Sequence, residues 1–369
     1  MGTTLVPFGT NRNRSHTRRC RRGRIQTSNH KLYLNNGVCM ESAQASRAMT
    51  ARASSVRHLP IGLFGSVMSV AGLSLAWRLA NKAYGDHAHI AVSNTIGVVA
   101  LALFVVLTLS YLNKLVRFPD VVKLEFSHPV IGSFFGTVGI SILLLSSVIG
   151  SYSTSAQLVV WTIGTVATLA LSVVMMSRLL NGNAAPATMV PAWLIAGVGS
   201  LDIVVTGGAL ASGWTHEVNL FAAAVGGVSA VVFFILILSR LIHHEPLAAA
   251  MRPSKMILVA PFAVGFIAYV NLVQRVDMFA ALLFYFGLFL FAIIFYRLLV
   301  KPAPFSPAWW GIGFPMAALS NAAFMYSAAV GGKGLALIAA LLLFLLTASI
   351  AVLSCRTVHA LLTGRLLSA

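Results

Sequence analysis

The sequence has very little charge. Only 9% of its 369 residues are Asp, Glu, Lys or Arg, whereas 58% are hydrophobic. Soluble domains carry about 25% charged residues, so a water-soluble enzyme of this length is excluded. Apolar stretches of about 20 residues can each cross a bilayer as a helix. The composition therefore predicts an all-α polytopic membrane protein embedded in a lipid bilayer.

The sequence also lacks the patterns that carry catalysis or metal binding. Cys20, Cys39 and Cys355 form neither a disulfide framework nor a metal-ligand spacing. There is no HExxH, no GxSxG, no P-loop and no cluster of acidic residues. We therefore expect no enzymatic activity, no cofactor and no metal site. An integral-membrane enzyme or a structural membrane partner is the alternative of another class.

Acidic residues are scarce, with 8 Asp and Glu against 26 Lys and Arg. Residues 1–57 hold 11 of these basic residues and a single acid, Glu41. The segment NRNRSHTRRCRRGR in this region is too polar to bury a core, which predicts a disordered N-terminal tail. A transit peptide and an arm that binds anionic lipid or RNA are the alternatives. No nucleic-acid partner is expected.

Residues 58–360 contain ten apolar stretches that are long enough to span a bilayer, and 361–369 form a short C-terminal end. With the basic tail inside, the cytoplasmic connections hold eleven Lys and Arg and the outer ones hold four, as the positive-inside rule requires. Both termini are therefore expected in the cytoplasm, with the protein in the plasma or inner membrane. The ten stretches are 59–81, 89–113, 129–150, 157–180, 187–210, 217–241, 254–274, 277–300, 308–329 and 335–357.

Proline is unevenly distributed among these stretches. Twelve of the 13 prolines precede or lie within odd-numbered stretches, and glycine is skewed in the same direction. This alternation is typical of a helical hairpin repeated five times. The prolines that begin the odd stretches are Pro60, Pro129, Pro191, Pro261 and Pro315. The last three are deep enough to kink their helices.

The alternation predicts which helices lie inside. Proline frees a backbone carbonyl and glycine exposes the backbone, and lipid satisfies neither. We therefore expect an inner ring of five odd-numbered helices around a central pore, surrounded by five even-numbered helices. The alternative is that small residues only permit close helix packing.

An inner path of this kind would be lined by hydroxyl and aromatic side chains, and this chemistry favours small anions over cations. The cytoplasmic Lys and Arg residues, among them Lys114 and Arg240, would form a basic rim that raises the local anion concentration. Phe314 stands out among the aromatic residues because Gly313 and Pro315 flank it and leave the backbone free to direct the ring toward the axis. An apolar ring in this position can close a narrow pore. The other candidates are Phe64, Ser66, Ser69, Ser133, Phe134, Phe135, Thr137, Trp193, Ser200, Thr206, Phe262, Phe266 and Ser320.

Asp202 is the one clear acidic residue inside an apolar stretch. Ionisable residues within a membrane are candidates for ion or proton pathways. Coupling of protons or cations through Asp202 would make the protein a coupled carrier rather than a passive pore. A hydrogen-bonded carboxylate near the outer mouth is the alternative.

Five segments, each at the start of an odd-numbered stretch, resemble the tellurite-resistance/dicarboxylate transporter family. They are HLPIGLFGSVMSVAGLSLAWR, HPVIGSFFGTVGISILLLS, PAWLIAGVGSLDI, MILVAPFAVGFIAY and FSPAWWGIGFPMAAL. That family includes bacterial tellurite-resistance proteins, yeast malate and sulfite transporters and plant slow-type anion channels.

The resemblance implies ten helices in five hairpins, a central pore and a homotrimer with one pore per subunit. It further implies transport of small inorganic or dicarboxylate anions and a pore-occluding phenylalanine at Phe314. If Asp202 couples transport to protons, the resemblance implies a carrier for dicarboxylate, sulfite or tellurite as the alternative. The family often has a hydroxyl residue where this chain has Gly313.

Overall fold

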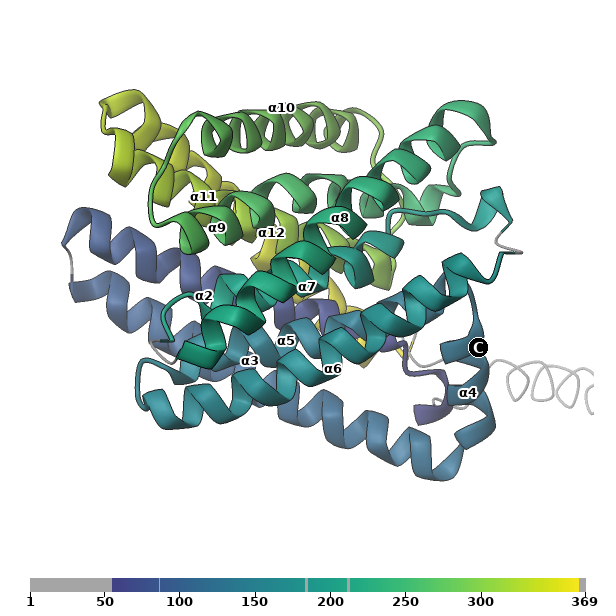
Figure 1. Ribbon diagram of the computed structural model, residues 1–369. Coiled ribbons are helices and arrows are strands. Elements are labelled where there is room, and N and C mark those ends of the chain that lie inside the picture. Colours follow the sequence, from purple (N-terminus) through teal and green to yellow (C-terminus); the bar gives the residue numbers. More distant parts are fainter. Residues whose placement is uncertain (1–54, 86, 183–184, 211–212, 365–369) are drawn as a thin grey trace, which may run out of the picture. The chain divides into compact units, whose positions relative to one another are not determined.

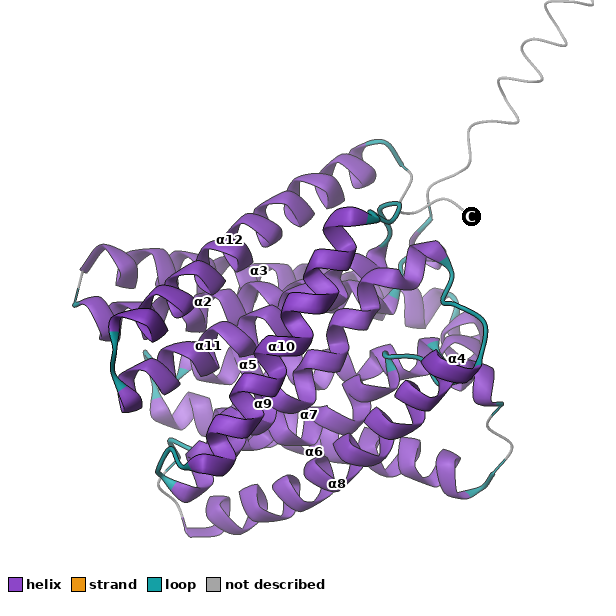
Figure 2. Cartoon of the chain, turned by 90° about the horizontal axis from the view of Figure 1, so that it is seen from above, coloured by secondary structure: helices purple, strands orange, loops and turns teal. Residues whose placement is uncertain are grey.

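The computed structural model describes residues 55–85, 87–182, 185–210 and 213–364. These residues form only helices and connecting loops (Figure 2), which confirms the all-α prediction. They belong to one unit of the chain that begins at Ala53. Cys20, Cys39 and almost all of the expected tail lie outside the described residues, as does most of 361–369.

The described part of the chain contains ten helices of at least 14 residues and one short helix, α4 (Pro119–Ser127). The ten are α2 (Phe64–Tyr84), α3 (His87–Arg117), α5 (Gly136–Ile149), α6 (Thr154–Leu180), α7 (Trp193–Gly207), α8 (Gly213–His243), α9 (Ala260–Val273), α10 (Met278–Val300), α11 (Gly313–Val330) and α12 (Lys333–Leu362).

Eight of these helices, some with a preceding 3₁₀ turn, are long and apolar enough to cross a membrane. The protein is therefore an integral membrane protein. Helix α7 is apolar but shorter, and α11 does not meet the same criteria. Ten crossings therefore stay a prediction.

A 3₁₀ helix precedes each of α2, α5, α7, α9 and α11. These are η2 (Ile61–Leu63), η3 (Ile131–Phe135), η4 (Pro186–Thr188), η5 (Ala249–Val259) and η6 (Pro307–Ile312). Pro191 lies in the turn before α7, while Pro261 and Pro315 lie in the first turns of α9 and α11. The three prolines therefore do not kink the interior of an α-helix. They stand where the α-helix begins, because a first-turn residue needs no N–H donor.

Helices α2, α5, α7, α9 and α11 form a closed ring. Along this ring each of the five helices packs against the next, and α11 packs against α2. We call these five the inner helices. The outer helices α3, α6, α8, α10 and α12 each pack against the inner helix that precedes them in the chain. Figure 1 shows α5, α7 and α9 near the middle of the bundle and α10 along its upper edge.

Burial separates the two sets of helices. In the apolar segments that contain α2, α5 and α9, between 61% and 78% of the residues are buried, against 17% to 33% in the five outer helices. Most side chains of α7 and α11 are also buried. The helices rich in proline and glycine are therefore the buried ones, as their composition predicted.

Candidate functional site

A small cavity lies where the five inner helices begin. Its volume is about 30 Å³, room for about one water molecule. Because residues near the start of every inner helix line it, these helices are parallel and start at the same level. The lining residues are Gly62, Gly65 and Met68 before and in α2; Phe134, Thr137 and Ile140 from η3 and α5; Leu194, Ile195 and Val198 from α7; Ile257 and Ala260 from η5 and α9; and Pro307, Trp310, Gly311, Phe314 and Pro315 from η6 and α11.

Phe314 is the second residue of α11, and its side chain lines this central cavity with only 8% of its surface exposed. The 3₁₀ helix η6 ends at Ile312, directly before α11. Phe314 therefore lies where the chain changes from a 3₁₀ helix to an α-helix. Phe134 faces the same cavity from the end of η3. Two phenylalanine side chains, one from η3 and one from α11, therefore line the central cavity.

Gly313 is required by the close approach of α2 and α11. A Cβ atom at this position would collide with the Oγ of Ser69. Ser69 is held there because its hydroxyl lies 2.7 Å from the carbonyl oxygen of Gly65 and 3.3 Å from that of Trp310. The serine hydroxyl thus occupies, from the neighbouring helix, the space that a side chain at position 313 would fill.

Most of the predicted pore-lining hydroxyl groups are bonded to their own helices. Ser66 donates to Leu63 O at 2.6 Å, Thr137 to Phe134 O at 2.6 Å and Thr206 to Asp202 O at 2.7 Å. Ser200 lies 2.9 Å from Ser172 on the outer helix α6. These bonds satisfy polar groups within an apolar bundle. Of the predicted hydroxyl residues, only Thr137 lines the central cavity.

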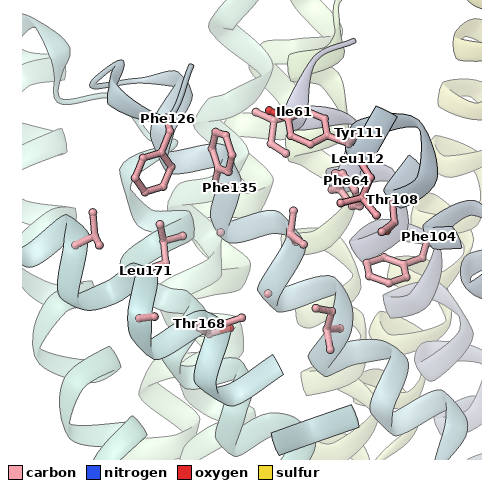
Figure 3. A pocket seen from close by; sticks show the side chains of 17 residues that line it. Ile61, Phe64, Phe104, Thr108, Tyr111, Leu112, Phe126, Phe135, Thr168 and Leu171 are labelled. Atoms are coloured by element: carbon pink, nitrogen blue, oxygen red, sulfur yellow. The ribbon is translucent and has the colours of Figure 1, made fainter. Parts of the chain in front are cut away.

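Phe64 and Phe135 face away from the central cavity. Both line a separate lateral cavity of about 500 Å³ between α3, α4, α5 and α6. Figure 3 shows Phe135 beside Phe126, and Phe64 grouped with Phe104 and Tyr111. The ring of Phe64 packs edge-on against Phe104, with centroids 5.9 Å apart, and Phe135 against Phe126 at 5.1 Å. These rings join inner helices to the elements around them.

The remaining aromatic candidates also pack toward outer helices. The Phe262 ring packs edge-on against Phe234 of α8 and Phe286 of α10. Phe266 contacts Phe284 of α10, and Trp193 contacts Phe233 of α8. Trp193 and Ser133 share a further cavity of about 320 Å³ with Arg178, beside the ring rather than inside it.

Asp202 is 1% exposed, and neither of its carboxylate oxygens has a hydrogen-bond partner among the described residues. Helical spacing places Asp202 one turn beyond Val198 and two turns beyond Ile195, which both line the central cavity. Asn321 lies two turns beyond Phe314 on α11, and its Oδ1 is likewise buried without a partner. The buried acceptors on α7 and α11 therefore follow the central cavity toward the other end of the ring. Ser320, whose Oγ also lacks a described partner, lies on another face of α11.

Lys114 departs from the expected basic rim. Its side chain is fully buried, and its Nζ donates to Glu125 Oε1 at 2.6 Å and to Leu59 O at 2.8 Å. Tyr111 donates to the other Glu125 oxygen at 2.8 Å. This group joins α3, α4 and the segment that leads into α2. The rim charge predicted for Lys114 therefore serves to position the start of an inner helix.

Sequence reasoning missed the apolar wall of the central cavity and the polar residue Asn321. Met68, Ile195 and Ile257 are ordinary apolar residues in apolar stretches, and nothing in their type distinguishes wall from core. Their spacing from the first proline or glycine of each odd-numbered stretch is the signal that could have found them. Asn321 is an amide in an apolar stretch and could have been named on the same grounds as Asp202.

Comparison with known proteins matches residues 58–358 to the family model described as SLAC1, voltage-dependent anion channel. The S-type anion channel SLAH2 of Arabidopsis thaliana is 27% identical over 282 residues, which cover 74% of this chain and 54% of that protein. An uncharacterized transporter of Methanocaldococcus jannaschii is 26% identical over 58% of this chain and 69% of its own length. A tellurite resistance protein TehA homolog of Haemophilus influenzae is 26% identical over 72% of this chain and 80% of its own length.

The aligned region spans about half the length of the plant relative. The family match extends from the segment before α2 into α12 and thus includes all the inner helices and the cavity at their start. This chain belongs to the voltage-dependent anion channel family.

Proposed function

We propose that the protein passes small anions down their gradient through the ring of inner helices, with Phe314 as the plug. The observation that carries this proposal is the central cavity, to which all five inner helices contribute and which Phe314 helps to reduce to about 30 Å³. A hydrated ion does not fit such a space, and an apolar constriction excludes water. On this proposal the pathway is closed while Phe314 lines the cavity, and it opens when the phenylalanine side chain leaves the axis.

The arrangement of the backbone favours anions. Five helices begin around the cavity, and the N-terminus of a helix carries a partial positive charge. Asp202 is the one buried acid among the described residues, whereas a cation path is expected to carry rings of acidic residues. The plant and bacterial relatives are named as anion channels and as a tellurite resistance protein, which agrees with anionic substrates.

The orientation and assembly form part of the proposal. The start of the inner helices faces the cytoplasm, where most basic residues outside the tail lie, and the protein resides in the plasma or inner membrane as a homotrimer with one pathway per subunit. Small inorganic or dicarboxylate anions are the substrates.

Replacement of the plug tests this function. Purified Phe314→Ala protein in liposomes should pass chloride several-fold faster than the unchanged protein. Phe262→Ala is the matched control, because it removes the same ring from an inner helix but on the side that faces α8 and α10. Equal flux through Phe314→Ala and unchanged protein, both correctly folded, would exclude Phe314 as the plug. Reversal potentials with chloride, nitrate, malate and sulfite would then rank the substrates.

Proton-coupled transport is a second candidate, because Asp202 is buried on the cavity side of α7 with both oxygens unpartnered among the described residues. A carboxyl group in that position can carry a proton across the bilayer. Coupling predicts that a pH gradient alone drives anion uptake and that Asp202→Asn abolishes this drive. Anion uptake that does not depend on the pH gradient would exclude proton coupling and favour the passive pathway.

A further inference from the structure

Four basic side chains gather where α8 and α10 end and η5 lies. Arg240 and Arg297 lie in the last turns of the outer helices α8 and α10, and Arg252 and Lys255 lie on η5. Lys255 is within range of the charges of Arg240, Arg252 and Arg297. We call these four residues the basic cluster.

Arg240 is the unusual member of the basic cluster. The residue is only 8% exposed, and its Nε and Nη1 atoms are buried without a hydrogen-bond partner among the described residues. An arginine in a last helical turn often donates to the free carbonyl groups there, but these two atoms do not. A buried guanidinium without an acceptor is costly and calls for a ligand that supplies one.

No ion pair among the described residues includes a member of the basic cluster. The ion pairs in this part of the chain are Lys114 with Glu125 and Arg275 with Asp277. Glu245 is the nearest acid in sequence, and it is exposed and makes neither of these pairs. Four cations that form no ion pair attract a ligand that carries more than one negative charge, and guanidinium groups match phosphate oxygens in geometry.

The side chains next to the basic cluster in sequence are apolar and exposed on the outside of the bundle. Ile242, Tyr296 and Leu299 flank Arg240 and Arg297 in sequence and are 65%, 66% and 67% exposed. Within the basic cluster itself, Arg252 and Arg297 are exposed, Lys255 is half-buried and Arg240 is buried, so the charges lead from the surface inward. A ligand with both a phosphate group and an apolar chain fits this combination better than free phosphate does.

We propose that the basic cluster binds a phosphate-bearing anion, and that the headgroup of an anionic lipid is its source. The phosphate oxygens accept from the buried Arg240 and from Lys255, while Arg252 and Arg297 hold the headgroup from the surface. The acyl chains lie along the exposed apolar side chains of α8 and α10. Since η5 carries both Arg252 and Ile257, and Ile257 lines the central cavity, a bound lipid would also hold one wall of that cavity in place.

Binding is tested on the purified full chain in detergent micelles, without any measurement of transport, so it does not depend on the proposed function. Short-chain phosphatidic acid, inorganic phosphate and phosphatidylcholine are titrated separately. Bound ligand is counted by native mass spectrometry, and the thermal unfolding midpoint is recorded. We expect phosphatidic acid to bind and to raise the midpoint, with weaker binding of phosphate and none of phosphatidylcholine.

The variants test the residues. Arg240→Gln should weaken phosphatidic acid binding about fivefold, and the double variant Arg252→Gln/Arg297→Gln about 25-fold. Arg117→Gln is the matched control, because it removes one exposed arginine from the end of outer helix α3 and should leave binding unchanged. Should Arg240→Gln fail to fold, the double variant at exposed positions still decides the question.

Two results would overturn the proposal. Equal binding of phosphatidic acid by the unchanged protein and the double variant would remove the site. Binding of phosphate as tight as that of phosphatidic acid would remove the lipid as the source and leave a site for free phosphate.

Discussion

A 3₁₀ helix precedes each inner helix, and the inner helices carry proline, glycine and hydroxyl residues. The outer helices are continuous and rich in leucine, valine and phenylalanine. The two sets also differ in burial, with 61% to 78% of residues buried in three inner segments and at most 33% in the outer helices. This difference shows that the helices are sorted by what their backbones require. A helix whose backbone is exposed by glycine or interrupted by proline has to lie against protein, and an unbroken apolar helix can face lipid.

The largest expected loss of stability comes from Lys114, a buried charged residue on the outer helix α3, most of which is exposed. Lys114→Met should lower the free energy of unfolding by about 3–5 kcal/mol, because it removes the charge that pairs with Glu125 and leaves Glu125 Oε1 and Leu59 O without a donor. Chemical denaturation in micelles measures the loss. The double variant Lys114→Met/Glu125→Gln should recover part of it. A neutral single variant would show that the ion pair does not hold α3, α4 and the start of α2 together.

The next effect tests the close packing of the inner ring. Gly72→Ala in α2 would place a Cβ atom 2.7 Å from the Cβ of Ala317 in α11, and neither atom can rotate away. We expect a loss of about 1–3 kcal/mol in unfolding free energy from this overpacking. The same denaturation experiment measures it. Unchanged stability would mean that α2 and α11 can separate without cost.

A glycine on an outer helix supplies the opposite prediction. A Cβ atom at Gly227 in α8 would meet no atom within 4 Å. Alanine favours the helix over glycine by about 1 kcal/mol, so Gly227→Ala should raise stability by up to that amount. If Gly72→Ala and Gly227→Ala shifted stability in the same direction, the contrast between inner and outer helices would fail at these positions.

The smallest effect concerns the connection between inner helix α9 and outer helix α10. Asp277 caps α10 by accepting from the N–H groups of Phe279 and Ala280, and its other oxygen accepts from the Tyr269 hydroxyl at 2.7 Å. The hydrogen bond from Tyr269, followed by that from the Ala280 N–H, lowers the pKa of Asp277 below its ordinary value. The stability that the Asp277 carboxylate gives to the folded state is therefore complete above the pKa of about 3.9 that Asp has in the unfolded chain. It is lost as the pH falls through the lower pKa of the folded state.

The Asp277 contribution is measured as the pH dependence of the thermal midpoint. The midpoint of the unchanged protein should fall more steeply below about pH 4 than that of Asp277→Asn, which has no carboxylate to protonate. Identical slopes for the two proteins would exclude this cap as a source of acid sensitivity.

The sequence predicted that the candidate site lies near the start of the inner helices, but it did not predict which residues line the cavity. Phe314, Phe134 and Thr137 line the central cavity, whereas Phe64, Phe135 and Phe262 lie toward outer helices. An inner helix buries one face against the axis and the other against its outer neighbours. Residue type is similar on both faces, so composition cannot separate them.

The amino-acid sequence by itself determined that the chain is an α-helical membrane protein and that alternate helices are the buried ones, because a bilayer offers no partner for backbone groups freed by proline and glycine. Only the tertiary structure decided which face of each inner helix meets the axis. It also decided that Lys114 and Arg240, which sequence reasoning assigned to a basic rim, are buried. The local sequence determines whether a helix can face lipid or must face protein. The burial of a single side chain depends on segments far apart in the chain that pack over it.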